Sequence, residues 1–109
     1  MAYSKELAAR VSAQLDELPN LVEKKMFGGV GYLLNGNMAC GVLNDDLIVR
    51  VGAENYQQAL DEPHTKLFDT TGRQMRGWVM VTPDGLADDA ELAEWVQKGV
   101  DFASTLPPK

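Results

Sequence analysis

A glycine-rich stretch is the part of the chain whose composition most suggests ligand chemistry. Residues 24–42, KKMFGGVGYLLNGNMACGV, contain five glycines. Nucleotide-binding loops place glycines in a G-x-G-x-x-G pattern before a helix, so that backbone N–H groups surround a phosphate. Here Gly29-Val30-Gly31 is followed by Leu34 where the third glycine would stand, and the pattern continues as a strand. We therefore expect a paired β-sheet and no phosphate site.

The residue types that most often perform acid–base or nucleophilic catalysis are few. His64 is the single histidine and Cys40 the single cysteine of the sequence. One histidine cannot supply a two-histidine metal motif, and an apolar run around Cys40 disfavours its thiolate. No serine lies in a G-x-S-x-G elbow. The sequence predicts no catalytic residue, no metal ligands and no cofactor.

The charge balance disfavours nucleic acid as a direct partner. Ten Lys and Arg residues stand against sixteen Asp and Glu residues, which gives a formal net charge of −6. Phosphate contacts need clustered basic charge, and an acidic molecule repels a polyanion. Two basic pairs, Lys24 with Lys25 and Arg73 with Arg76, are the candidates for a local exception. The same acidic charge favours contact with a basic protein.

Apolar periodicity predicts the elements that would position these residues. Helices are expected from the Ser4 cap to near Pro19, over residues 53–60, and from Asp88, where Glu91 completes an acidic capping box. Strands are expected at residues 26–34, 38–43, 47–51, 67–68 and 78–81. The order α-β3-α-β2-α predicts a single α+β domain over residues 1–109, with an antiparallel sheet and helices in two layers.

The dipeptide Asn35-Gly36 predicts a two-residue hairpin turn, since both residues tolerate positive φ. Such a turn fixes the register between the strands that flank it. The resulting pairs are Leu34 with Asn37, Gly31 with Cys40 and Gly29 with Val42. Each glycine would then face a larger residue, which explains the glycines without a ligand.

Two features are candidates for an interaction surface. The segment from Arg73 to Trp78 combines two arginines, a glycine and a tryptophan, which are residue types that suit protein interfaces. For Trp78 we favour the alternative that it belongs to the core of an ordinary strand, because Val79 and Val81 extend that strand. The second feature is the unpaired edge of the sheet, because small sheet domains often cover an edge by dimerising.

These residues also resemble a known family. The 24–42 stretch, then LIVRV, then Gly72-Arg73 with Gly77-Trp78 and the acidic-capped last helix are similar to the N-terminal domain of the TfoX/Sxy competence regulators. The similarity runs from about residue 7 to residue 102, and Met26-Phe27-Gly28-Gly29 is its most specific part.

The resemblance implies a fold similar to type III secretion chaperones. It also implies a role like that of the full-length regulators, which control DNA-uptake genes together with the cyclic-AMP receptor protein and carry a second domain. By this resemblance, the 109 residues are expected to correspond to the first domain alone. The resemblance implies no catalytic residues, so none is assigned to this sequence.

The leading hypothesis is a non-enzymatic cytoplasmic binding module, a homodimer without a membrane segment, that contacts a protein partner such as a transcription regulator. Its expected contact residues are Lys24, Lys25, Phe27, Arg73, Arg76 and Trp78. The alternative is a small-ligand-binding or enzymatic domain with a pocket at the sheet–helix junction near Lys24, His64 and Arg73.

Overall fold

The computed structural model describes residues 3–26, 28–70 and 73–108, and the side chains of these residues except 26, 69–70 and 73–76. The elements in chain order are α1 (Lys5–Leu15), β1 (Leu21–Met26), β2 (Gly29–Leu34), β3 (Asn37–Leu43), β4 (Asp46–Arg50), α2 (Tyr56–Leu60), β5 (Thr65–Thr70), β6 (Arg73–Val81), a 3₁₀ turn η1 (Pro83–Gly85) and α3 (Asp89–Ser104).

The helices begin where the sequence supplies caps. The Ser4 hydroxyl accepts a hydrogen bond from the Leu7 N–H at 3.1 Å, and the Asp88 carboxylate accepts one from the Ala90 N–H at 2.9 Å. Each bond satisfies an N–H group that has no partner within its own helix. α1 ends before Pro19, as expected from the sequence. Both predicted N-cap residues are confirmed, whereas no described hydrogen bond joins the Glu91 side chain to the Asp88 N–H, as a capping box would require.

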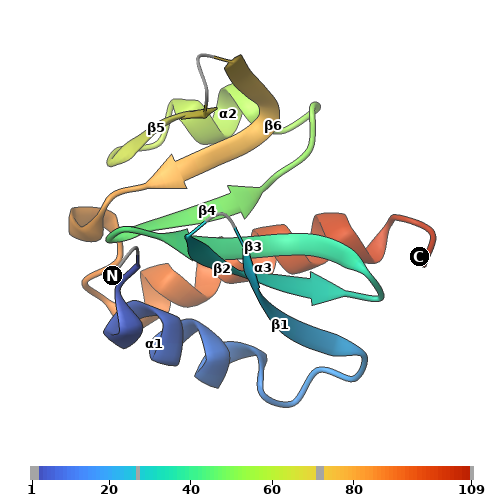
Figure 1. Cartoon of the computed structure of the whole chain (residues 1–109). Helices are drawn as coiled ribbons and strands as arrows, with labels where there is room; N and C mark the ends of the chain where they lie inside the picture. The colour runs from blue at the N-terminus through green and yellow to red at the C-terminus, as the bar shows by residue number, and fades with distance from the viewer. Residues whose placement is uncertain (1–2, 27, 71–72, 109) are drawn as a thin grey trace.

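The strands form one antiparallel sheet in the order β1-β2-β3-β4-β6-β5, so that β1 and β5 are its two edges. Figure 1 shows α3 running behind the sheet, with α1 beside it and α2 behind the β5–β6 hairpin. Buried residues of all three helices belong to one hydrophobic cluster with the strands, so the helices share one side of the sheet. The architecture is the two-layer α+β arrangement that the sequence predicts.

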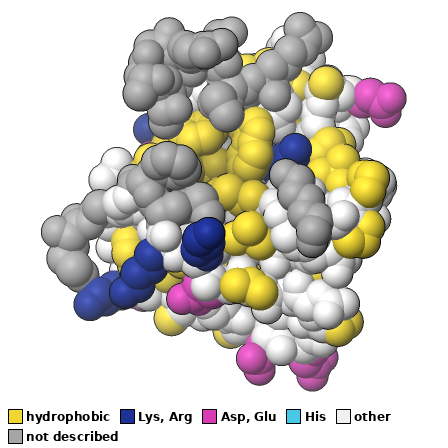
Figure 2. Space-filling model, turned by 45° about the vertical axis from the view of Figure 1, so that its right-hand side comes forward, with side chains coloured by type: hydrophobic (Ala, Val, Ile, Leu, Met, Phe, Trp, Pro, Cys, Tyr) yellow, Lys and Arg dark blue, Asp and Glu magenta, His cyan; other side chains and the backbone are white. Residues whose placement is uncertain are grey.

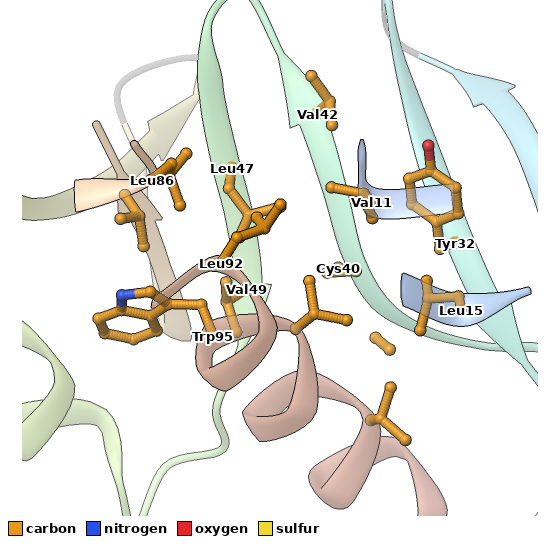
Figure 3. Close-up of a cluster of buried hydrophobic side chains, with 14 of the residues drawn as sticks. Val11, Leu15, Tyr32, Cys40, Val42, Leu47, Val49, Leu86, Leu92 and Trp95 are labelled. Atoms are coloured by element: carbon orange, nitrogen blue, oxygen red, sulfur yellow. The ribbon is translucent and has the colours of Figure 1, made fainter. Parts of the chain in front are cut away.

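The core lies between the sheet and α1 and α3. Leu92 and Trp95 point from α3 toward Leu47 and Val49 of β4, and Val11 and Leu15 of α1 lie on the side of Tyr32 (Figure 3). Tyr32 is 1% exposed, and its hydroxyl donates to the Ala8 carbonyl oxygen at 3.0 Å. The buried ring therefore has a hydrogen-bonded hydroxyl, and this bond joins β2 to α1 and helps to hold the helix on the sheet.

The structure corrects the predicted element order by adding one strand. No strand was expected at residues 21–25, and one strand was expected over residues 26–34, but residues 21–26 form a separate strand β1 that pairs with β2 from Leu21↔Leu34 to Met26↔Gly29. The order is therefore α-β4-α-β2-α. The charged run Glu23-Lys24-Lys25 does not resemble a buried strand, yet an edge strand tolerates charge because one of its sides meets water.

The predicted β2–β3 register is correct next to the turn and wrong farther away. Asn35 and Gly36 both have positive φ, and Leu34 pairs with Asn37 as expected. A register shift after the Leu33↔Met38 pair then moves β3 by one residue. Gly31 consequently faces Gly41 instead of Cys40, and Val42 faces Val30 instead of Gly29. The glycine-rich stretch is paired sheet, as predicted, but within the β2–β3 pair Gly31 faces another glycine.

Candidate interaction surface

The side of the sheet opposite the helices carries two of the candidate residues, Lys24 and Trp78, and we name it the open face. Directly paired residues point to the same side, so the pairs Ile48↔Met80 and Arg50↔Trp78 place these four side chains together there. The remaining described members are Val22, Lys24, Leu33, Met38, Leu43, Asp46, Lys66 and Phe68, as the register places them.

No described helix packs on the open face. Ile48 and Met80 lie deepest in it, at 5% and 9% exposed, while Leu33, Met38, Leu43, Phe68 and Trp78 are partly exposed. In Figure 2, hydrophobic side chains gather near the centre of the view, with Lys and Arg side chains beside them. An apolar sheet face with basic residues around it has the composition of an interaction surface.

An aromatic and cationic cluster lies at one end of the open face. The Trp78 ring packs at a tilt on the Phe68 ring, with centroids 6.1 Å apart. The Arg50 guanidinium carbon lies 5.2 Å from the Trp78 ring centroid and 5.4 Å from that of Phe102. Rings on two sides hold the guanidinium in place by cation–π attraction, and its N–H groups keep their capacity to donate. The alternative that Trp78 is a core residue is wrong, since it is only partly buried.

Phe102 reaches this cluster because Gly52 has no side chain. A Cβ atom at Gly52 would lie 2.5 Å from the Phe102 ring, and Gly52 has a φ of +86°, which favours glycine. The chain leaves β4 at this point, so the ring from α3 passes the end of the strand. The C-terminal part of α3 therefore contributes one wall of the Arg50 site.

The described charges of the open face differ in sign from those of the whole chain. Asp46 is its one described acidic residue, and its carboxylate pairs with the Lys66 ammonium at 3.2 Å. Arg50 and Lys24 lie on the same face, and no carboxylate forms an ion pair with Arg50 among the side chains that the structure describes. Locally the described face is basic, although the chain has a net charge of −6.

The predicted contact residues are distributed as follows. Lys24 and Lys25 are both exposed on β1, but neighbouring residues of a strand point to opposite faces, so only Lys24 belongs to the open face. Trp78 belongs to it as well. Phe27 lies outside the described residues. Arg73 and Arg76 belong to β6, and their side chains lie outside the described part.

Lys24 and His64, two of the residues predicted to lie near the alternative ligand pocket, do not come together. Lys24 lies on β1 and His64 directly precedes β5, so they are at opposite edges of a six-stranded sheet. A hollow of about 770 Å³ lies elsewhere, between α2 and α3. Its charged lining residues are Glu54, Glu62, Asp101 and Lys98.

Cys40 is a buried thiol, as the sequence predicts. Cys40 is fully buried in the core, and burial raises the pKa of its thiol to about 12. A thiol with this pKa is protonated at neutral pH and is a poor nucleophile. Burial also raises the pKa of Tyr32 to about 12, and a hydrogen bond with Ser12 acts in the opposite direction.

Sequence reasoning missed Arg50, Phe68 and Phe102. One signal for Arg50 was present: alternation through Asp46, Ile48 and Arg50 places these residues on one face of a strand. The cluster itself depends on the pairing of β4 with β6, which are not consecutive strands, and on the passage of Phe102 beside Gly52. Neither contact follows from local pattern.

A family model, the TfoX N-terminal domain, matches residues 13–103. The chain belongs to this family. The resemblance found in the sequence is therefore confirmed over most of the chain's length. A search of curated proteins found no match.

In the described part of the chain, no helix is both long and apolar enough to span a membrane.

Proposed function

We propose that this TfoX N-terminal domain is a non-enzymatic regulatory module of the cytoplasm that controls DNA-uptake genes through contacts with another protein. Family membership supports a competence-related role. The inert thiol and the separation of His64 from the basic residues favour binding over catalysis.

The observation that carries the proposal is the open face. Helices bury one side of the sheet, and the other side presents partly exposed apolar residues around the ring-stacked Arg50. Tryptophan and arginine are the residue types that contribute most to binding energy at protein interfaces. The Arg50 guanidinium is already ordered by Trp78 and Phe102, so a partner that binds it loses little side-chain entropy.

The local charge defines the partner more closely than the net charge does. The net charge of −6 favours a basic partner, but the described open face carries Lys24, Arg50 and Lys66 against Asp46 alone. Attraction across an interface depends on the charges that face each other. We propose that the partner contacts this face with an acidic and apolar surface, in which a carboxylate pairs with Arg50.

Deletion of the gene in its native host tests the regulatory role. Transcripts of the DNA-uptake genes are measured under conditions that induce competence, with the deletion strain and a strain complemented in trans. The proposal expects the transcripts to fall on deletion and to return on complementation. Unchanged transcripts in the deletion strain would remove the competence role.

We further propose that the module is a homodimer. The support is the sheet, which ends in two edge strands that no described element covers. The two edge strands, β1 and β5, differ in the charges that protect them, and we use this difference below to choose between them as the dimer contact.

A further inference from the structure

The two edges of the sheet are not equally protected against pairing with another strand. Each has one exposed large hydrophobic residue, Val22 on β1 at 57% and Leu67 on β5 at 40%. β1 also carries two exposed lysines, Lys24 and Lys25, which is a common protection of an edge because pairing would desolvate them. The lysine of β5, Lys66, forms an ion pair with Asp46 of β4, so its ammonium group is directed across β6 and away from the edge. β5 is therefore the less protected edge.

We propose that β5 pairs with β5 of a second copy in antiparallel orientation about a two-fold axis. This inference specifies the homodimer proposed above and is independent of the partner on the open face. Pairing would satisfy the outward-facing backbone groups of Thr65 and Leu67, since the Thr82 N–H donates to the His64 carbonyl oxygen and the alternation from that pair turns the groups of Lys66 toward β6. It would also bury the exposed Leu67 side chain on both copies. The two sheets would become continuous.

Symmetry restricts the register to a few choices. Directly opposed residues of antiparallel strands point to the same face, whereas neighbouring residues of one strand point to opposite faces. A two-fold axis normal to the sheet keeps each side chain on its own face, so a residue cannot be opposed by the copy of its neighbour. The axis must therefore place one residue opposite its own copy. Lys66 opposite Lys66 would oppose two like charges, which is destabilising. Phe68 opposite Phe68 would centre the pairing on the register shift between Leu67 and Asp69, where the strand is irregular.

The remaining register places Leu67 opposite Leu67 and Lys66 opposite Phe68 of the other copy. Both pairs are compatible, since the first joins two apolar side chains and the second places the lysine stem against an aromatic ring. This register also stays within the regular part of β5. We therefore assign Leu67 to the two-fold axis.

Net charge opposes this contact and provides a first test. Each copy carries a formal charge of −6, so the two copies repel each other at long range. Salt screens that repulsion, whereas the Leu67 contact is apolar. Sedimentation equilibrium is expected to show a dimer that strengthens as sodium chloride is raised. A dimer that weakens with salt, or a monomer at high micromolar concentration in high salt, would overturn the proposal.

Cysteine cross-linking tests the register directly. Leu67→Cys, Lys66→Cys and Val22→Cys are each oxidised under mild conditions, and disulfide-linked dimer is followed on non-reducing gels. Cys40 stays in all three variants because it is fully buried. In the proposed register the two copies of residue 67 lie about 5 Å apart, within disulfide range. The two copies of residue 66 are offset along the strands by about 6.6 Å and so lie about 8 Å apart, beyond that range.

Leu67→Cys is expected to cross-link at least about tenfold faster than Lys66→Cys or Val22→Cys. Faster cross-linking of Lys66→Cys would overturn the register, and faster cross-linking of Val22→Cys would place the contact on β1. Leu67→Lys, with Val22→Lys as the matched control, gives a second readout in which only the β5 variant should become monomeric. A cross-linked dimer in a host whose DNA-uptake genes do not respond to deletion would retain this inference and remove the proposed function.

Discussion

The contact between α3 and β3 predicts that a single methyl group at Gly99 destabilises the fold. A Cβ atom at this position would overlap the carbonyl oxygen of Ala39. Ala39 lies at the register shift of β3 and is fully buried, so its backbone has no space to retreat. The neighbouring Val49 Cγ1 would lie 3.5 Å from the new atom, in ordinary contact, and it adds no strain.

The magnitude follows from two opposing effects. Replacing glycine by alanine inside a helix stabilises it by about 1 kcal/mol. Overpacking against a backbone atom costs roughly 1–3 kcal/mol, and more when the helix as a whole must shift. The obstacle at Gly99 is a carbonyl oxygen and not the end of a flexible side chain, so the upper part of that range applies. We expect Gly99→Ala to lower the free energy of unfolding by about 2 kcal/mol.

Urea denaturation followed by circular dichroism measures this loss. Glu94→Ala, at an exposed position of the same helix, is the control and should change stability by less than about 0.5 kcal/mol. Ala39→Gly combined with Gly99→Ala should not restore stability, because the overlapping oxygen belongs to the backbone. A Gly99→Ala variant as stable as the wild type, or rescue by Ala39→Gly, would refute this account of the helix–sheet contact.

Three further outcomes are expected. Burial raises the pKa of Cys40 from 9.0 and that of Tyr32 from 10.0 to about 12 in each case, so the folded state disfavours their ionised forms. Their contribution to stability is therefore complete below the unfolded-state pKa values and is lost as pH rises from about 9 to 12. The free energy of unfolding, measured against pH, should decline over this range, and Cys40→Ala should make the decline shallower. Asn37→Ala removes the buried amide that donates to the Pro107 carbonyl oxygen at 2.8 Å, and hydrogen exchange should show loss of protection in the last residues together with a stability loss of about 1 kcal/mol. Trp78→Ala removes the contacts with Phe68 and Arg50, and thermal unfolding should show a folded protein destabilised by about 2 kcal/mol; an unfolded variant would contradict its placement outside the core.

Local sequence chemistry predicted the elements whose signals are themselves local. Ser4 and Asp88 cap helices through a side chain that bonds a nearby N–H group, and Asn35-Gly36 fixes a turn through positive φ at both residues. Each of these needs only a few neighbouring residues.

The errors in the fold occur where distant residues determine the structure. β1 is a strand because β2 lies beside it, while its own charged sequence is typical of an exposed loop. The register of β3 shifts by one residue at Ala39, and Gly99 of α3 packs against the backbone there. Gly99 lies sixty positions later in the chain. No short window of sequence contains both residues.

The candidate surface was predicted in part. Trp78 and Lys24 were identified from residue type, and both lie on the open face. Arg50 was not identified, because its role depends on Trp78 across a non-consecutive strand pair and on Phe102 from the last helix. The basic character of the face was also missed, since net charge averages over the whole molecule and does not report where charges of each sign lie.

Complementation of the deletion strain with Trp78→Ala tests the central claim that the module acts through its open face. Gln14→Ala, an exposed position of α1 on the other side of the sheet, is the control. With equal protein levels confirmed by immunoblot, we expect Gln14→Ala to restore the transcripts of the DNA-uptake genes and Trp78→Ala to leave them at the deletion level. Full restoration by Trp78→Ala would contradict the assignment of the open face as the binding surface.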